Sequence, residues 1–310
     1  MRKILITGGA GFIGSSLAER LSKDSENLVV IADNLVTGSQ AKIPKSVHNN
    51  VKFLKTDVNN LEDVSGVFYS YGFDYIFHYA AVVGVQRTLN HPVMVLNDID
   101  GIKNILSLSK NTLVKRVFYS SSSEVYGEPF EFPQNEKTTP LNSRLPYAIV
   151  KNVGEAFFKS YYQEYGLEYT IFRFFNTYGP NQSEDFVVPR FLKAALKNEP
   201  IYLYGDGLQT RSFCYVDDNV DTCVAILNEN HCINDVINVG SDKEQTILSL
   251  AQTIINITNS KSEIIHLPPL EEGDMARRCP DTSKMKQVLG RELVSLEEGI
   301  LKLVDYYKNK

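Results

Sequence analysis

A phenol and an ammonium group stand four residues apart at Tyr147 and Lys151, in the segment YAIVK. This spacing places two side chains one turn apart on the same face of a helix. A free tyrosine has a pKa near 10, so a tyrosine base near neutrality needs a shift of roughly three units, or about 4 kcal/mol. One cation at about 4 Å, in an effective dielectric of about 20, supplies roughly that energy. The pair therefore predicts a base that removes a proton from a hydroxyl group, with Ser122 holding the same oxygen.

The spacing alone is weak support, because Tyr306 and Lys310 share it near the end of the sequence. The alternative is a surface helix with an exposed tyrosine–lysine pair beside solvated serines. The catalytic interpretation is favoured because Tyr147 follows the serine-rich end of a predicted strand, Tyr119–Ser123. In a doubly wound α/β sheet, ligands bind at the carboxyl ends of the strands.

A glycine-rich turn connects a predicted buried strand to a predicted helix, with glycines at Gly8, Gly11 and Gly14. This GxxGxxG spacing allows a tight turn, and it brings backbone N–H groups, including those of Phe12 and Ile13, close to a pyrophosphate. Ordinary structural turns also use glycine, so the triplet is not decisive by itself. The strand before it and the helix after it favour a dinucleotide-binding turn.

Asp33 ends the second predicted strand, nineteen residues past Gly14. A carboxylate at this position accepts hydrogen bonds from the ribose hydroxyls of adenosine and repels a 2′-phosphate. The next residue, Asn34, adds no positive charge for such a phosphate. We therefore predict that both residues contact NAD rather than NADP. The alternative is an aspartate that only ends a strand beside a structural turn.

Short apolar runs alternate with helical patterns over the first 175 residues, which indicates βαβ units and a parallel sheet. The runs are nearly continuously hydrophobic, as expected for strands that are covered on both faces. The predicted strands are Ile4–Thr7, Leu28–Asp33, Val51–Thr56, Tyr75–Tyr79, Arg116–Ser120 and Tyr169–Phe174. The predicted helices cover residues 12–22, 60–70, 93–110 and 146–165.

Turn clusters at Tyr178–Asn181 and Tyr204–Gly207 mark a change in the pattern. We therefore expect an α/β fold in which a doubly wound, parallel-sheet Rossmann domain over residues 1–175 binds NAD. A smaller mixed α/β domain over residues 176–310 would bind a nucleotide sugar. The segment 211–240 again has a strand–helix–strand pattern and could return to the first sheet.

Composition narrows the class of protein. The 310 residues carry a net charge of −5 and give a pI of about 5.6, which argues against a binder of nucleic acid or anionic membranes. No apolar run approaches the roughly 18–20 residues that span a bilayer. The cysteines have no CxxC spacing, so neither a metal site nor a disulfide scaffold is expected, and a reducing cytoplasm is the predicted location. They are Cys214, Cys223, Cys232 and Cys279.

Nearly the whole chain resembles the extended short-chain dehydrogenase/reductases that act on nucleotide sugars. This epimerase/dehydratase family includes UDP-glucose 4-epimerase-like and UDP-glucuronate decarboxylase-like members. The motifs that carry the resemblance are TGGAGFIGS (7–15), Asp33, TDV (56–58), HYAA (78–81), SSSEVYG (121–127), YAIVK (147–151), RFFNTYGP (173–180), YGDGLQTRSFCYVDD (204–218) and PDTSK (280–284).

The resemblance implies a role for each matching position. Ser122, Tyr147 and Lys151 would form a catalytic triad, with Lys151 also holding the nicotinamide ribose. Asp57 and Val58 would contact adenine. Backbone atoms of Ala80, Ala81 and Val82 would lie along the cofactor, and His78 would pack behind it. The positions implied for the substrate are Ser123, Asn176, Val188, the stretch Ile201–Tyr204 that includes Tyr204, Arg211, and one of Arg277 and Arg278, of which we choose Arg278. Guanidinium groups suit bidentate contact with phosphate, although structural salt bridges are the alternative for both arginines.

The sequence departs from the family pattern at Asp98, where an asparagine is usual before the GTxN-like segment. The usual hydrogen bonding at a helix kink is therefore expected to differ in this chain. The neighbouring Asn97 is the other candidate for that role.

Members of the family first oxidise the sugar, usually at carbon 4, and differ in the later steps. Dehydratases carry Asp-Glu before VYG, and the general acid of that pair is missing from Ser123-Glu124. Decarboxylases carry Ser-Glu there, but they follow FNTYGP with an arginine where this chain has Asn181. Epimerases need only the triad, and the segment VVPRFLKAALKNEPIYLYGDG resembles theirs.

We therefore predict a 4-epimerase, with Glu124 among the catalytic residues as the group that orients a substrate hydroxyl. A decarboxylase and a dehydrogenase that releases the 4-ketosugar and NADH remain alternatives. A non-catalytic NAD-sensing scaffold on the same fold is disfavoured because all three triad residues are present.

The resemblance also implies a homodimer through two long helices, near 93–110 and 146–165. The second helix carries more aromatic side chains than one core face needs: Phe157, Phe158, Tyr161, Tyr162 and Tyr165. The alternative is that these rings pack against the sheet.

Overall fold

The computed structural model describes residues 1–128, 130–269 and 277–309. Within these residues the chain packs as two compact units. The first holds Met1–Gly127, Pro140–Phe174 and Val220–Ile237, and the second holds Glu128–Thr139, Phe175–Asn219 and the described residues from Asn238 on. We expected a boundary near residue 175, with the segment 211–240 as a candidate to return to the first sheet. The chain also changes unit near residues 128, 140, 220 and 238, so each unit is assembled from separate segments.

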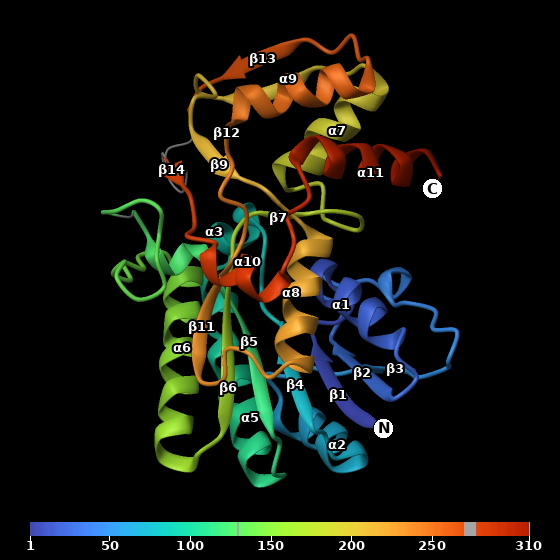
Figure 1. Cartoon of the computed structure of the whole chain (residues 1–310), viewed down its shortest axis with the longest axis vertical. Coiled ribbons are helices and arrows are strands. Elements are labelled where there is room, and N and C mark those ends of the chain that lie inside the picture. Colours follow the sequence, from blue (N-terminus) through green and yellow to red (C-terminus); the bar gives the residue numbers. More distant parts are fainter. Residues whose placement is uncertain (129, 270–276, 310) are drawn as a thin grey trace. The chain divides into compact units, whose positions relative to one another are not determined.

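A seven-stranded sheet in the order β11-β6-β5-β4-β1-β2-β3 forms the centre of the first unit (Figure 1). The pairings β1/β2, β1/β4, β2/β3, β4/β5 and β5/β6 are parallel, which confirms the predicted α/β class. The strands are β1 (Arg2–Thr7), β2 (Asn27–Asp33), β3 (Val51–Lys55), β4 (Tyr75–His78), β5 (Arg116–Ser122), β6 (Glu168–Phe174) and β11 (Asp235–Val239). The edge strand β11 explains why 220–237 belongs to this unit.

Helices cover both faces of this sheet. The elements are α1 (Phe12–Ser22), η1 (Gln40–Lys42), α2 (Leu61–Tyr71), α3 (Val85–Asn90), α4 (Pro92–Leu96), α5 (Asp98–Asn111), η2 (Ser123–Tyr126), α6 (Pro146–Tyr165) and α8 (Val216–Asn228). Arg20 of α1 pairs with Asp221 of α8 on one face, while α5 packs between α2 and α6 on the other. Both faces are therefore buried, which is why the strands are continuously apolar.

The helix predicted over 93–110 is two helices, α4 and α5, separated at Asn97. Asp98 is the first residue of α5, and its carboxylate accepts a hydrogen bond of 2.7 Å from the backbone N–H of Val82. At Asp98, where the chain departs from the family pattern, a carboxylate at the start of α5 therefore binds the backbone of the segment after β4.

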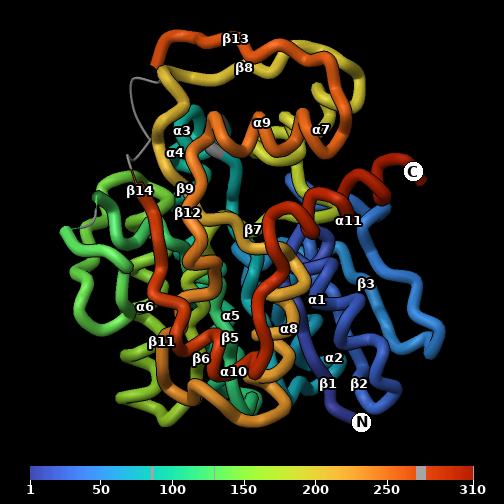
Figure 2. The backbone as a smooth tube through the Cα atoms, turned by 45° about the horizontal axis from the view of Figure 1, so that its top comes forward, coloured from blue at the N-terminus to red at the C-terminus, as the bar shows by residue number. Residues whose placement is uncertain are grey.

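The second unit contains short strands and four helices within the described residues. They are β7 (Thr177–Tyr178), α7 (Val187–Lys197), β8 (Ile201–Tyr204), β9 (Thr210–Ser212), β10 (Cys214–Tyr215), β12 (Glu244–Thr246), α9 (Ile247–Thr258), β13 (Ile264–Leu267), β14 (Arg277–Arg278), α10 (Ser283–Leu289) and α11 (Leu296–Lys308). The parallel strands β8 and β13 lie side by side in Figure 2.

Gln134 holds the segment 128–139 to the rest of the second unit. Its backbone N–H donates to the carbonyl oxygen of Cys279 at 2.8 Å. Its own carbonyl oxygen accepts from the N–H of Asp281 at 2.8 Å and from the side-chain amide of Asn238 at 2.9 Å. These bonds explain why 128–139 packs with residues that follow it by more than a hundred positions.

Among the described residues, no helix has the length and apolar character needed to cross a lipid bilayer. The same residues contain no cluster of histidine, cysteine and carboxylate side chains that could hold a metal ion. The four cysteines, all within the described part of the chain, form no disulfide.

Candidate active site

The residues predicted to bind the cofactor follow the ends of four neighbouring strands. Gly8 follows β1, Asp33 ends β2, Asp57 comes shortly after β3, and Ala80 comes shortly after β4. Because these strands are parallel neighbours, their carboxyl ends meet at one edge of the sheet. The topology therefore brings together residues that lie up to about 70 positions apart in sequence.

The glycine turn has no room for side chains. Gly8 has a φ of +70°, and a Cβ there would lie 2.6 Å from the backbone nitrogen of Ala80. A Cβ at Gly14 would clash with the carbonyl oxygen of Gly8. Gly11 is the N-cap of α1 and supplies no side-chain cap, so the first N–H groups of the helix, at Phe12 and Ile13, are left for another acceptor. This arrangement fits the pyrophosphate of a dinucleotide.

Asp33 is buried at the same edge of the sheet. Its two carboxylate oxygens accept hydrogen bonds from the backbone N–H of Ala10 at 3.0 Å and of Leu35 at 2.8 Å. Each oxygen keeps a further lone pair that ribose hydroxyls could use. Asn34 uses its side-chain oxygen to cap the turn at Val36, at 3.0 Å. The position of Asp33 fits its predicted role, whereas Asn34 has a local structural partner.

Hydrogen bonds hold backbone groups in the segments after β3 and β4. The Asp57 carboxylate accepts from the N–H of Asn59 at 3.0 Å, and the following Val58 is buried. The N–H of Ala80 donates to the hydroxyl of Thr7 at 3.3 Å, and Ala81 connects it to Val82. These segments are positioned at the predicted cofactor edge.

Ser122 is the last residue of β5, two residues beyond the predicted end of that strand. It is 9% exposed, and its hydroxyl oxygen accepts a hydrogen bond of 3.2 Å from the N–H of Glu124. Ser122 is thus the N-cap of η2, which contains the buried Ser123 and the half-buried Glu124. The strand end therefore delivers Ser122 and Glu124 to the carboxyl edge of the sheet.

Lys151 is 3% exposed and lies on α6. Its ammonium group donates to the carbonyl oxygen of Ser120 at 2.6 Å, and it also lies 3.3 Å from the hydroxyl of Ser120. Burial lowers the pKa of Lys151 to about 8, and the carboxylate of Asp98 opposes this shift. The pKa of the Lys151 amine therefore lies close to neutral pH.

Tyr147 lies one turn before Lys151 and is half-buried. The Lys151 nitrogen is 5.7 Å from the centre of the Tyr147 ring and 5.1 Å from that of Tyr119. The structure therefore brings together the phenol, the ammonium group and the end of β5, as the predicted triad requires.

His78 lies behind this group. It is buried, and its Nδ1 lies 2.8 Å from the hydroxyl of Thr7. Burial, reinforced by the positive charge of Lys151, lowers the pKa of His78 to about 3. A neutral, buried histidine fits the expectation that His78 packs behind the cofactor.

Two arginines predicted to bind phosphate are neighbours in the second unit. The parallel pairing of β9 with β14 places Arg278 directly beside Arg211, and both side chains are buried. Arg277 instead donates to Glu244 at 2.6 and 2.8 Å and is half exposed. Asn176 also reaches this region, since its side chain donates to the carbonyl oxygen of Ser212 at 3.0 Å.

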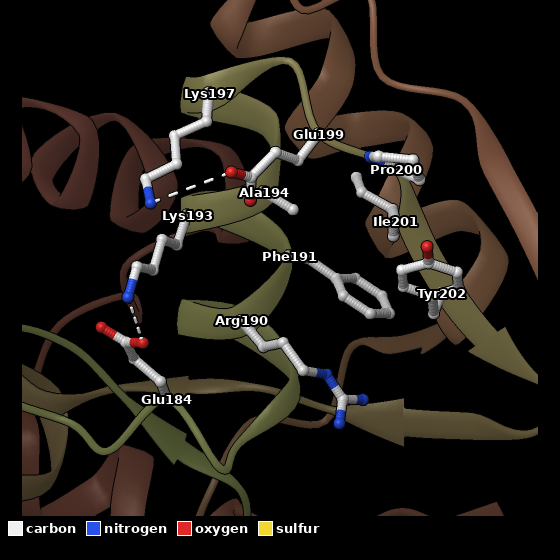
Figure 3. A pocket seen from close by; sticks show the side chains of 10 residues that line it. All are labelled: Glu184, Arg190, Phe191, Lys193, Ala194, Lys197, Glu199, Pro200, Ile201 and Tyr202. Carbon is white, nitrogen blue, oxygen red and sulfur yellow. Dashed lines mark hydrogen bonds and ion pairs between the residues drawn. The ribbon is translucent and has the colours of Figure 1, made fainter.

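A cavity of about 360 Å³ lies between α7 and β8 in the second unit (Figure 3). It includes Ile201 from the predicted nucleotide-binding stretch, whereas Val188 and Tyr204 are not among its lining residues. In Figure 3, Lys193 turns toward Glu184 and Lys197 toward Glu199, at 2.5 and 3.9 Å. The remaining lining residues are Arg190, Phe191, Ala194, Pro200 and Tyr202.

Glu155 is a site residue that was not predicted from the sequence, although it continues the four-residue spacing of Tyr147 and Lys151 along α6. Its carboxylate is buried and forms an ion pair with Arg173 of β6. The repeated spacing could have pointed to it, because charged residues on a buried helix face require partners.

The chain is similar to known proteins over almost its whole length. Residues 4–240 match the model of the NAD dependent epimerase/dehydratase family. The UDP-N-acetyl-alpha-D-glucosaminuronate decarboxylase of Bacillus cytotoxicus is 34% identical over 99% of this chain and 98% of its own.

Two solved structures show the same extent of similarity. The UDP-glucose 4-epimerase of Thermotoga maritima, with UDP-glucose, has 32% identity and a TM-score of 0.92, covering 99% of both chains. The UDP-glucuronic acid 4-epimerase of Bacillus cereus, in complex with UDP-glucuronic acid and NAD, has 30% identity and a TM-score of 0.89, again over 99% of both chains.

Proposed function

The chain belongs to the NAD dependent epimerase/dehydratase family, and on that premise we propose that it is a nucleotide-sugar 4-epimerase. Membership confirms the predicted family and the predicted cofactor, NAD. The observation that carries the proposal is the placement of Lys151: a buried ammonium group, bound to the end of β5, faces the ring of Tyr147.

The proposed reaction starts with Tyr147 as its phenolate, which the positive charge of Lys151 stabilises. Tyr147 takes the proton of the sugar 4-hydroxyl while Ser122 donates a hydrogen bond to the same oxygen. Bound NAD supplies the chemistry of accepting the hydride from carbon 4 and later returning it. Once the ketosugar has turned over in the site, Tyr147 would return the proton to the oxygen of carbon 4, and the configuration at carbon 4 would be inverted.

Arg211 and Arg278 are proposed to bind the diphosphate oxygens of the substrate. Their adjacent positions on β9 and β14 support this role, because two planar guanidinium groups suit bidentate contact with phosphate. We do not propose this role for Arg277, whose guanidinium group is bonded to Glu244. Asn176, Ser123, Val188 and Tyr204 stay predicted substrate contacts.

Asn181 favours epimerisation over decarboxylation. It occupies the position at which the decarboxylases usually carry an arginine. Its side-chain oxygen accepts a hydrogen bond of 2.8 Å from the hydroxyl of Tyr306 on α11, and its φ is +67°. An amide in this packed position supplies no positive charge for a sugar carboxylate.

Decarboxylation of a nucleotide sugar with a carboxyl group at carbon 6 is the second candidate. The Ser123-Glu124 pair and the similarity to the decarboxylase of Bacillus cytotoxicus support it. The same triad would oxidise carbon 4, after which the 4-keto group would take up the electrons left by departing carbon dioxide.

Incubation with a panel of nucleotide sugars separates these reactions. We expect a product of unchanged mass, without accumulation of NADH, from at least one sugar. Loss of carbon dioxide would establish the decarboxylase instead. Stoichiometric NADH with loss of two hydrogens would establish a dehydrogenase that releases the ketosugar. Binding of NAD without turnover of any sugar would favour the non-catalytic alternative.

We also propose that the chain forms a homodimer through α4 and α6. Exposed apolar and aromatic side chains on these helices support this assembly: Val93, Leu96, Ile149, Tyr162 and Tyr165. Phe158, by contrast, is buried against the sheet, so only part of the aromatic surface of α6 is available to a partner.

A further inference from the structure

A buried ion pair joins α6 to β6 beneath the candidate active site. Glu155 is 1% exposed and Arg173 is 2% exposed. The guanidinium group donates two hydrogen bonds to the two carboxylate oxygens, at 2.9 and 2.7 Å. Burial opposes the charge of Arg173, but the bonds to Glu155 outweigh it and hold the pKa of Arg173 above its ordinary value. A buried ion pair is weak evidence for a contribution to stability. The other residues that this pair binds are therefore the better guide to its role.

The pair binds the residues on both sides of Ser122. The hydroxyl of Ser121 donates to Glu155 Oε1 at 2.7 Å. Arg173 Nη1 donates to the hydroxyl of Tyr126 at 2.8 Å, and the guanidinium carbon lies 4.7 Å from the centre of that ring. Ser121 directly precedes Ser122, and Tyr126 ends the short η2 that directly follows it. Both flanks of Ser122 are thus fastened to one ion pair.

The same face of α6 carries Tyr147 and Lys151, two of the proposed catalytic residues. Tyr147, Lys151 and Glu155 follow one another at intervals of four residues. Lys151 bonds to Ser120 and Glu155 bonds to Ser121, so successive turns of α6 bind successive residues of β5. Across the sheet, Ser121 of β5 is in register with Arg173 of β6. Helix α6 and strands β5 and β6 are therefore bonded to one another next to Ser122, the last residue of β5.

We propose that the Glu155–Arg173 pair positions Ser122 relative to Tyr147 and Lys151, and so sets the rate of proton transfer. This inference rests on the proposed function, in which Ser122 and Tyr147 bind the same substrate oxygen. Two groups that share one oxygen must keep their spacing, since a displacement of about 1 Å can cost about a hundredfold in rate. The half-exposed Lys159, whose nitrogen is 3.7 Å from Glu155 Oε2, lies at the outer side of the pair.

The test removes each link to Ser122 and leaves the ion pair in place. Ser121→Ala deletes the bond to Glu155, and Tyr126→Phe deletes the bond to Arg173. Glu155→Gln is avoided because it would leave a buried arginine without its counter-charge and could prevent folding. The matched controls are Ser109→Ala, a buried serine that bonds only locally to Ile105 at 2.6 Å, and Tyr169→Phe, a buried tyrosine at the start of β6.

We expect Ser121→Ala and Tyr126→Phe each to lower kcat about tenfold with KM for the nucleotide sugar nearly unchanged. The deuterium isotope effect with substrate labelled at carbon 4 should rise, because the chemical step becomes slower relative to product release. Ser121→Thr, which keeps a hydroxyl, should restore most of kcat. Both controls should keep wild-type kcat and isotope effect.

Crystal structures of the two variants test the positioning role without relying on the reaction that the enzyme catalyses. A displacement of the Ser122 hydroxyl from Tyr147 by more than about 0.5 Å supports the positioning role. An unmoved Ser122, or wild-type kcat and isotope effect in both variants, overturns it. If the wild-type chain turns over no nucleotide sugar, the proposed function fails, and the crystal structures alone decide the inference.

Discussion

At the scale of single residues, the proposed mechanism makes the charge of Lys151 decide whether Tyr147 can act as a base. Burial draws the pKa of Lys151 down to about 8, and Asp98 is the carboxylate that opposes this shift. Two further titratable groups near the amine are neutral near pH 7, because burial lowers the pKa of His78 to about 3 and raises the pKa of Tyr119 well above 10. Asp98 therefore supplies the negative charge that keeps the ammonium form.

Asp98→Asn should move the alkaline limb of the kcat/KM profile to lower pH. Removing the carboxylate lowers the pKa of Lys151 further, so the ammonium group is lost at a lower pH, by about one unit. The matched control is Asp100→Asn on the same helix, because Asp100 is exposed and pairs with Lys103. An alkaline limb that stays in place in Asp98→Asn would mean that Asp98 does not tune the lysine.

Tyr147→Phe should lower kcat by about 10²–10⁴, because it removes the proposed general base and keeps the ring. The affinity for NAD, measured by titration calorimetry, should change little. Turnover at the wild-type rate would refute the assignment of Tyr147.

At the scale of elements, the sequence predicts those helices and strands that local residue patterns encode. The strand from Arg116 and the helix 146–165 are found within two residues of their predicted ends. The helix 93–110 was predicted as continuous, although Asn97 and Asp98 were the candidates for hydrogen bonding at a kink. The bond between Asp98 and Val82, sixteen residues away, was not predicted. The pairing of Arg211 with Arg278 was also beyond local patterns, since β14 is two residues long and lies far along the chain from β9. Glu155 was missed although it continues the spacing of Tyr147 and Lys151, and its partner Arg173 lies 18 residues away on another element.

Gly14→Ala should weaken NAD binding by about tenfold or more, because a Cβ there collides with the carbonyl oxygen of Gly8 and the turn must shift. Titration calorimetry measures the loss. Gly66→Ala in α2 is the control, since a Cβ there meets no atom within 4 Å. Alanine is also more favourable than glycine inside a helix, by about 0.8–1 kcal/mol. This control should raise Tm and leave NAD binding unchanged. Equal NAD affinity in both variants would contradict the assignment of the turn.

At the scale of the whole molecule, the exposed side chains of α4 and α6 predict association. Sedimentation at micromolar concentration should give a particle of about twice 34.9 kDa. Tyr165→Glu, which places a charge among these exposed side chains, should shift the particle to the monomer mass. Glu297→Gln on α11 is a charge-changing control outside this surface and should stay dimeric. A wild-type monomer would remove the proposed interface.

The separate segments of the two units have a consequence for any attempt to dissect the protein. A fragment that stops at residue 175 lacks β11, so the backbone of β6 becomes an open edge. It also retains 128–139 without the partners that Gln134 binds at Asn238, Cys279 and Asp281. Such a truncation should aggregate. Chimeras that exchange the second unit will have to transplant 128–139 together with the later segments, and keep 220–237 with the recipient.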